Sequence, residues 1–158
     1  SFDEIAYNRL SQLSNKSNQF NLTTKRYSVT DIENVSNNDQ YITLYGNLVD
    51  NFGDNGIVSV VIGNIRENVV HIDVWIMSCR VLKRGMENAM MDCLVAECKK
   101  RNIDTINGYY YPTAKNKMVK DFYSQFGFEK ISEDQNGNAI WILDISKYQN
   151  TNNIIEVK

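Results

Sequence analysis

Hydrophobic residues recur at the spacing of an α-helix in three stretches of the chain. The second stretch runs from Gly85 to Arg101 and ends in basic residues, which the negative end of a helix dipole favours. The third runs from Lys115 to Phe126 and is followed by Gly127, a residue suited to close a helix. The first is a narrow apolar stripe near the start, formed by Ile5, Ala6, Leu10 and Leu13.

Runs of β-branched and aromatic residues predict six strands between and after these helices. The first three runs are joined by short, turn-rich links, which favours antiparallel pairing. Thr30 and Glu33 form a capping-box pattern that predicts a further short helix over Asp31–Val35. The predicted strands are Tyr41–Val49, Ile57–Ile65, Val69–Met77, Thr105–Tyr111, Phe128–Ser132 and Ala139–Asp144.

This order of elements predicts an α+β fold with α/β/α layers, in which a mixed, mostly antiparallel twisted sheet carries helices on both faces. The chain has 158 residues, so we expect a single domain over residues 1–146. Residues 147–158 are expected to form a polar tail or an edge strand.

Composition and charge narrow the range of functions. The net charge is −2 and the pI about 5.4, so no overall basic field attracts nucleic acid or an anionic membrane. The apolar runs have the length of strands, and we expect no membrane span. The three cysteines lack the spacing of metal ligands, which favours a reducing, cytoplasmic environment and predicts no metal site.

The link between the third strand and the long helix is a candidate anion site. A helix N-terminus has unpaired N–H groups and a positive dipole end, which suit a phosphate or pyrophosphate. Arg80, Lys83 and Arg84 add three cations in a chain that is acidic overall. A solvated basic loop that caps the helix explains the same residues equally well.

Tyr123 is a second candidate, on the predicted helix Lys115–Phe126. It follows Phe122 directly and is expected at the edge of the apolar face. A phenol there can deliver a proton to a leaving thiolate. It can also cover the core with its hydroxyl in water, the simpler interpretation of the residue alone.

The run NKMVKDFYSQFGF, residues 116–128, resembles the last conserved segment of the GNAT (Gcn5-related N-acetyltransferase) superfamily. The loop RVLKRG, residues 80–85, is similar to the pyrophosphate loop of that superfamily, with Lys83 in place of its first glycine. The resemblance implies that the strand ending near Met77 separates from its neighbour and admits a pantetheine arm. It implies that Asn116 contacts this arm and that Tyr123 protonates the thiolate. The residues implied to hold the cofactor are Met77, Ser78, Arg80, Val81, Leu82, Lys83, Arg84, Gly85 and Asn116.

Four blocks in order resemble the C-terminal region of FkbH-like proteins: LSNKSNQFNLTTKRY, DNFGDNGIVSVVI, IDVWIMSCRVLKRGME and YYPTAKNKMVKDFYSQFGF. FkbH-like proteins are HAD-superfamily proteins that load a glyceryl unit onto an acyl carrier protein. This chain has no Asp-x-Asp-x-Thr motif, so the resemblance implies the GNAT-like domain alone. Residues 1–22 would then be a helix and linker from an upstream HAD phosphatase-like domain. The implied partners are that domain and an acyl carrier protein. CoA or a 4′-phosphopantetheine thioester would be the co-substrate, without a covalently bound cofactor.

Several polar residues have two interpretations. Cys79 precedes Arg80 near a helix start, where a lowered pKa would favour a thioester relay, but free cysteines are commonly buried. Asp50 and Asp54 suit either an acceptor substrate or a tight turn. His71 is the only histidine and has no evident partner in the sequence, so a Ser-His-Asp site is not expected.

Two functions from different classes follow. The leading hypothesis is a GNAT-like acyltransferase domain that binds a phosphopantetheine thioester on CoA or on a carrier protein. The alternative is an inactive GNAT-fold module that docks a carrier protein or the HAD domain. A small-molecule N-acetyltransferase is a third, weaker possibility.

Overall fold

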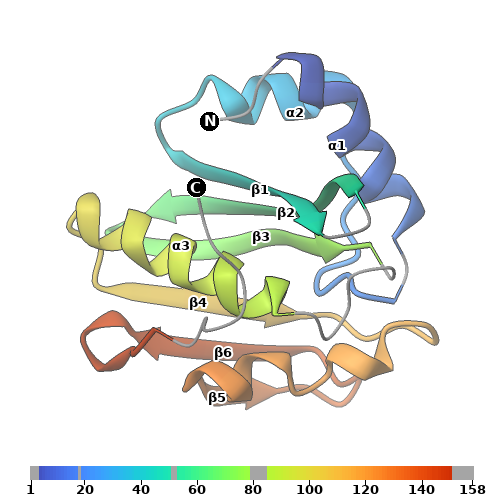
Figure 1. The fold of residues 1–158 in the computed structure, drawn as a ribbon. Helices are drawn as coiled ribbons and strands as arrows, with labels where there is room; N and C mark the ends of the chain where they lie inside the picture. The colour runs from blue at the N-terminus through green and yellow to red at the C-terminus, as the bar shows by residue number, and fades with distance from the viewer. Residues whose placement is uncertain (1–3, 18, 51–52, 79–84, 151–158) are drawn as a thin grey trace.

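A twisted six-stranded sheet crosses the computed structural model, which describes residues 4–17, 19–50, 53–78 and 85–150 (Figure 1). The strand order is β1-β2-β3-β4-β6-β5, and only the β3–β4 pair is parallel. The predicted mixed, mostly antiparallel sheet is therefore confirmed. The strands are β1 (Tyr41–Asp50), β2 (Gly53–Arg66), β3 (Val69–Met77), β4 (Thr105–Tyr110), β5 (Glu129–Glu133) and β6 (Ala139–Asp144).

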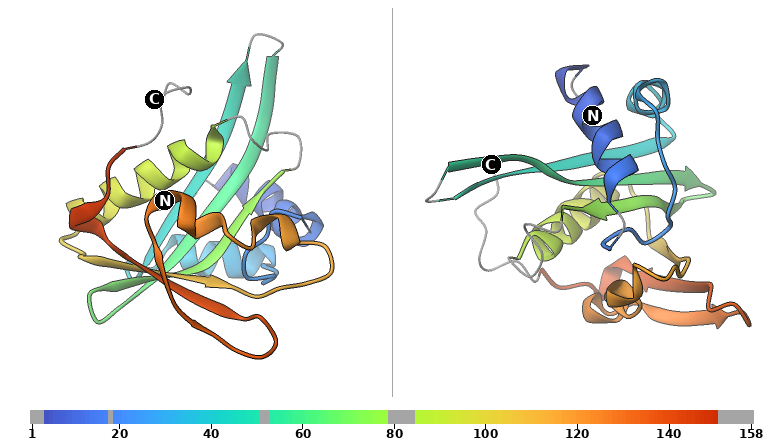
Figure 2. Two further views of the ribbon diagram at one scale, coloured as in Figure 1. Left: turned by 90° about the horizontal axis from the view of Figure 1, so that it is seen from below. Right: turned by 90° about the vertical axis from the view of Figure 1, so that its right-hand side faces the viewer.

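Helices cover both faces of the sheet. On one face, α1 (Glu4–Lys16) and α2 (Val29–Ser36) bury their apolar side chains against β2 and β3. On the other face, α3 (Met86–Lys100) packs in the larger core, which extends to β4 and β6. Figure 2 shows these layers edge-on, with α1 and α2 on the opposite side of the sheet from α3. None of the helices in the described part of the chain combines the length and apolar character needed to span a bilayer.

The short second helix begins earlier than predicted. Ser28 is its N-cap: its hydroxyl accepts a hydrogen bond from the Asp31 N–H at 3.1 Å, and the Asp31 carboxylate accepts one from the Ser28 N–H at 3.0 Å. The capping box thus uses Ser28 and Asp31 in place of Thr30 and Glu33. These bonds also lower the pKa of Asp31.

The predicted helix Lys115–Phe126 is instead two 3₁₀ turns, η2 (Lys117–Val119) and η3 (Phe122–Phe126). Phe122 and Tyr123 are adjacent in sequence and both buried, so the chain turns tightly to direct both rings inward. Gly127 ends the segment at φ 85°, as predicted. Downstream, η4 (Ile145–Lys147) follows β6, and the tail at 151–158 lies outside the described residues.

A β-bulge in β3 decides where the sheet opens. Two steps along β3, from Ile72 to Val74, oppose one step along β2, so Asp73 is the extra residue. Side chains before the bulge, such as Ile72, belong to the α3 core, whereas Val74 belongs to the α1–α2 core. Pairing of β3 with β4 is confined to three residue pairs, the last of which joins His71 to Asn107. The expected separation of these two strands is therefore present.

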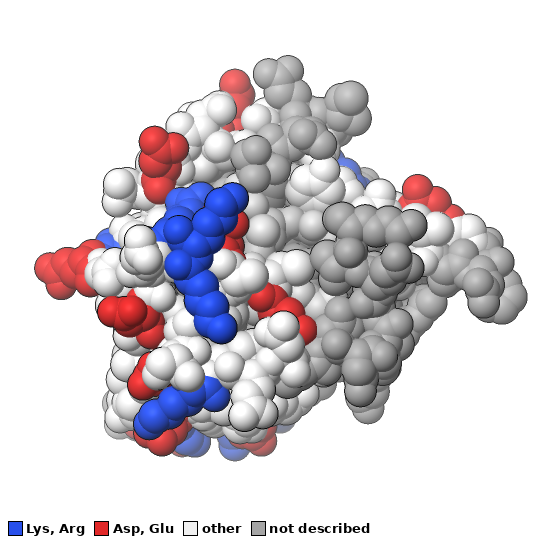
Figure 3. Space-filling model, turned by 60° about the vertical axis from the view of Figure 1, so that its left-hand side comes forward, with Lys and Arg blue, Asp and Glu red and all other residues white. Residues whose placement is uncertain are grey.

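Charges of both signs lie among one another on the face shown in Figure 3, where basic side chains are flanked by acidic ones. This matches a chain with 17 basic and 19 acidic residues.

Candidate functional site

The gap between β3 and β4 is filled by the chain itself. Residues 20–23, here called the inserted segment, run antiparallel to β3 beyond the bulge. The Met77 N–H donates to the Phe20 carbonyl at 3.1 Å, and the Leu22 N–H donates to the Trp75 carbonyl at 3.2 Å. On the other side, the Tyr111 N–H donates to the Leu22 carbonyl at 2.9 Å. The inserted segment therefore bridges the two separated strands.

Side-chain packing holds the inserted segment in place. Leu22 is fully buried and Phe20 nearly so. The Phe20 ring meets Phe122 edge-on with centroids 5.0 Å apart, and Trp75 meets the same ring at 4.9 Å. This aromatic cluster joins the inserted segment, β3 and η3 in one core.

The resemblance implied that a pantetheine arm pairs with β3 at this level. The groups that it would use, the Met77 N–H and the Trp75 carbonyl, are already bonded to the inserted segment. Displacing that segment would break hydrogen bonds worth about 1 kcal/mol each. It would also expose two large apolar side chains, at about 1.5–3 kcal/mol each. The separation of the strands is confirmed, but the slot between them is closed in this structure.

Asn116 anchors the same segment. Its side chain is fully buried, and its amide nitrogen donates to the Asn21 carbonyl at 2.9 Å and to the Tyr111 carbonyl at 3.0 Å. Its side-chain oxygen accepts from the Thr113 N–H at 2.7 Å and from the Tyr110 hydroxyl at 3.2 Å. Both ends of the amide are thus committed to the protein, and contact with a pantetheine arm stays a prediction.

Tyr123 lies in the core and not at the edge of a helix. Its hydroxyl donates to the Tyr109 carbonyl at 2.9 Å and accepts from the Tyr109 N–H at 3.1 Å. The ring rests on Gly108, where an added Cβ would lie 2.4 Å from it. Burial raises the pKa of the phenol far above its ordinary value. A proton donor must reach its leaving group; here the phenol reaches only backbone. The geometry gives Tyr123 a structural role, and a catalytic one remains a prediction.

The other predicted site residues divide into two groups. Met77 is buried, and the Ser78 N–H donates to the Val58 carbonyl at 2.7 Å, which extends the edge of the sheet. Gly85 precedes α3 at φ 87°, a conformation in which glycine is favoured. Cys79, Arg80, Val81, Leu82, Lys83 and Arg84 lie outside the described residues.

A hollow of about 820 Å³, here called the cationic hollow, opens at the end of β3 on the side of α1. Met77 and Ser78 form part of its wall, next to Phe20 of the inserted segment. Sequence reasoning did not connect these elements, because α1, the end of β3 and the loop after β4 are far apart along the chain. Its described lining includes three cations and no acid: Arg9, Leu13, Lys16, Ser17, Gln19, Phe20, Met77, Ser78, Ala114 and Lys115.

The remaining polar candidates have structural explanations where they are described. The Asp54 carboxylate accepts from the Gly56 N–H at 2.7 Å, a turn contact. The side chain of Asp50 lies outside the described residues. On α3, burial raises the pKa of the Cys98 thiol to about 12, so this cysteine is not a nucleophile near neutral pH.

Solved structures share this architecture over most of the chain. The ribosomal-protein-S18-alanine N-acetyltransferase of Escherichia coli matches with a TM-score of 0.67 and 14% identity, over 92% of this chain and 91% of that one. A GNAT-family acetyltransferase of Staphylococcus aureus Mu50 gives 0.67 and 16%, over 91% and 96%. The chain has the GNAT fold. The predicted fold class is therefore confirmed.

A third structure contains a cofactor. The PaiA N-acetyltransferase of Thermoplasma acidophilum, in complex with coenzyme A, matches the GNAT fold of this chain with a TM-score of 0.58 and 14% identity, over 73% of this chain and 68% of that one. Comparison of the sequence with family models and with curated proteins finds no match.

Proposed function

We propose that this GNAT-fold domain binds a phosphopantetheine-linked acyl group, on CoA or on an acyl carrier protein, at the cationic hollow, as part of an acyl-transfer system. The observation that carries the proposal is the composition of that hollow. The end of β3 forms part of its wall, and its charged side chains among the described residues are Arg9, Lys16 and Lys115.

The hollow has the chemistry of a phosphate site with an apolar extension. Arginine pairs with phosphate oxygens through parallel hydrogen bonds, and lysine contributes a mobile point charge. Leu13, Phe20 and Met77 supply apolar wall. The volume lies within the range of about 300–1,000 Å³ that is usual for small-molecule sites. A ligand with a phosphate at one end and a slender organic arm fits this combination.

The partner that fits the FkbH-like resemblance is an acyl carrier protein, and the acyl group is a glyceryl-type unit. The phosphopantetheine arm of a carrier protein ends at its phosphate and has no adenosine. The cationic hollow, next to the closed slot, therefore needs to hold only the phosphate and the adjoining atoms of the arm. In this proposal, transfer requires the inserted segment to move, because the acyl group cannot otherwise reach β3.

A second function is favoured by the closed slot itself. With β3 paired to the inserted segment and Tyr123 enclosed, the domain has the features of a docking module without transferase chemistry. Lys117 and Lys120 are exposed beside the hollow residue Lys115 and would meet an acidic carrier protein. Charge reversal at Lys117 would then weaken carrier binding as much as reversal at Lys115.

Calorimetric titration with CoA, 4′-phosphopantetheine, and carrier protein with and without its phosphopantetheine arm tests both functions. We expect saturable binding of the ligands that carry the arm, weakened about tenfold by Lys115→Glu, as the loss of one charged contact predicts. The matched control is Lys147→Glu, which reverses the charge of an exposed side chain outside the cationic hollow. Equal binding of carrier protein with and without the arm would support docking alone. The absence of binding to every ligand would reject both functions.

A further inference from the structure

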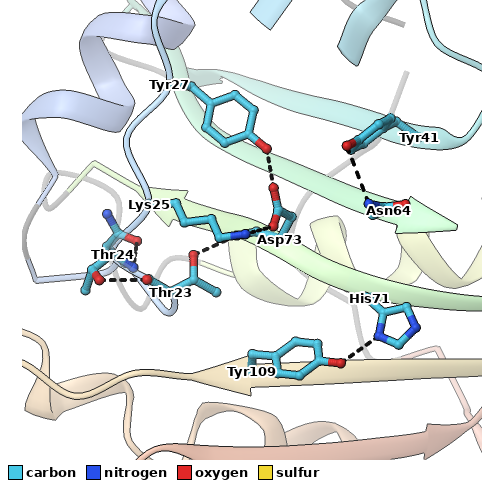
Figure 4. A network of polar contacts seen from close by, with 10 residues as sticks. Thr23, Thr24, Lys25, Tyr27, Tyr41, Asn64, His71, Asp73 and Tyr109 are labelled. Carbon is cyan, nitrogen blue, oxygen red and sulfur yellow. Dashed lines mark hydrogen bonds and ion pairs between the residues drawn. The ribbon is translucent and has the colours of Figure 1, made fainter. Parts of the chain in front are cut away.

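A second hollow lies between β2, β3, β4 and the chain that follows the inserted segment. It has a volume of about 150 Å³ and shares no lining residue with the cationic hollow. We call it the histidine hollow, because the only histidine of the chain forms part of its wall. Its lining is Thr23, Lys25, Asn64, Arg66, His71, Ile72, Asp73, Tyr109 and Tyr111. Figure 4 shows six of these side chains, which come from the linker, β2, β3 and β4: Thr23, Lys25, Asn64, His71, Asp73 and Tyr109.

His71 is held by a phenol. Its Nδ1 is 2.6 Å from the Tyr109 hydroxyl, and the two rings are stacked with centroids 5.9 Å apart. The two residues lie on neighbouring strands: His71 belongs to the last β3–β4 pair, and Tyr109 lies two residues beyond its partner Asn107 on β4 (Figure 4). Because Nδ1 is engaged, Nε2 is the nitrogen that remains for a ligand.

Of the two basic residues that line the histidine hollow, one forms an ion pair with a described residue and the other does not. The Asp73 carboxylate is bonded to the Lys25 ammonium and to the Tyr27 hydroxyl, and the Asp73 carbonyl accepts from the Thr23 hydroxyl at 2.7 Å. The positive charge of Lys25 is therefore largely balanced. Arg66 forms no ion pair with any residue that the structure describes, and it lines the same hollow.

Among the described charged side chains that line the hollow, Lys25 and Arg66 are positive and Asp73 is negative, so the lining has one net positive charge; Glu67 lies near His71 but is not part of the lining. Burial lowers the pKa of His71, Arg66 lowers it further, and Glu67 opposes them. At neutral pH the imidazole is therefore uncharged and can donate or accept one hydrogen bond at Nε2. The groups that face it come from the linker, from β2 and its turn, from β3, from β4 and from the residue after β4: Lys25; Asn64, Arg66 and Glu67; Asp73; Tyr109; and Tyr111.

We propose that the histidine hollow binds a small oxyanion, the carboxylate or phosphate of a small molecule, between the Arg66 guanidinium and the His71 imidazole. Arginine and imidazole donors match such oxygens in geometry and charge. The volume corresponds to about five water molecules at ~30 Å³ each, so the site accommodates one anionic group with a short substituent, not a nucleotide. This inference is independent of the proposed phosphopantetheine function, because the two hollows have separate linings.

The single histidine makes the test direct, since NMR signals of its ring arise from one residue. The intact chain is titrated with inorganic phosphate and, separately, with acetate, against sodium chloride at matched ionic strength. We expect saturable shifts of the His71 ring signals with at least one anion. Its pKa is expected to rise by about 0.5–1 pH unit at saturation, since a bound negative charge favours the imidazolium. The two arms distinguish a phosphate ligand from a carboxylate.

Two variants complete the test. Arg66→Gln removes the charge of an exposed side chain and is expected to weaken the anion about tenfold, the loss of one charged hydrogen-bonding partner. Lys100→Gln, exposed on α3 and absent from the lining, should leave the titration unchanged. Shifts that grow linearly and match those in chloride would overturn the proposal, as would equal affinity in wild type and Arg66→Gln. Lys115 lines the cationic hollow and not the histidine hollow, so Lys115→Glu tests the first function alone and either function can fail without the other.

Discussion

Replacing Tyr123 with phenylalanine separates a structural phenol from a catalytic one. The substitution removes a single oxygen from a fully buried side chain and leaves the ring in place. That oxygen both accepts from the Tyr109 N–H and donates to the Tyr109 carbonyl. The variant therefore leaves two partly buried backbone groups of Tyr109 without this partner.

The expected loss follows from those two groups. A buried donor or acceptor without a partner costs about 1–3 kcal/mol. Partial relaxation of β4 would recover some of this, so we expect Tyr123→Phe to lower the free energy of unfolding by about 2–4 kcal/mol. For a domain whose total stability is about 5–15 kcal/mol, this is a large effect.

Urea unfolding, followed by tryptophan fluorescence, measures the effect through the midpoint and slope. Tyr111→Phe is the matched control, because the Tyr111 side chain is exposed, and its change should stay within about 0.5 kcal/mol. A loss below about 0.5 kcal/mol for Tyr123→Phe would refute the structural role. If thioester turnover then fell while stability held, the phenol would be assigned to the chemistry.

Three other changes test the packing of the buried residues. Gly108→Ala places a Cβ 2.4 Å from the Tyr123 ring, and we expect a loss of about 2–3 kcal/mol in the same urea assay; unchanged stability would mean that the ring moves freely. Phe20→Ala should cost about 3–5 kcal/mol and accelerate hydrogen exchange at the Leu22 amide, and slow exchange there would contradict the packing of the inserted segment. Burial raises the pKa of Tyr27 and Tyr123 in the folded state, so their stabilisation is complete below pH 10. It should fall above pH 10 by up to about 1.4 kcal/mol per group and pH unit, and urea midpoints that are flat to pH 11 would disprove it.

The strands were predictable because their signals are local. β2 is marked by the β-branched residues Val58, Val60 and Val61. The end of η3 is marked by a glycine, Gly127, and the structure shows the positive φ that this residue type favours. The break of the third helix into 3₁₀ turns was not predictable from periodicity. The segment begins at Asn116, whose side chain binds four partners, one of them far away in sequence at Asn21, and periodicity does not report such long-range bonds.

The closed slot was missed for a similar reason. Phe20 and Leu22 alternate with polar residues, a strand-like pattern that lies outside the six predicted strands. The pattern alone does not say which strand the segment joins. Its partners on β3 and after β4 are at least 50 residues away, as the Thr23–Asp73 bond illustrates, and loop closure of that length has no local signature. His71 likewise lacked a partner in the sequence because Tyr109 is 38 residues away.

Asp73 links the opening of the sheet to the chain that fills it. As the extra residue of the bulge, Asp73 switches the alternation of β3 and ends its pairing with β4. The same residue then binds the linker that fills the opening: its carbonyl accepts from Thr23, and its carboxylate holds Lys25 and Tyr27. A strand that merely separated would expose unpaired backbone groups to the core, at a cost of several kcal/mol. Pairing the inserted segment with β3 removes that cost, so the opening of the sheet and its internal occupant form a single structural unit, with one hollow at each end.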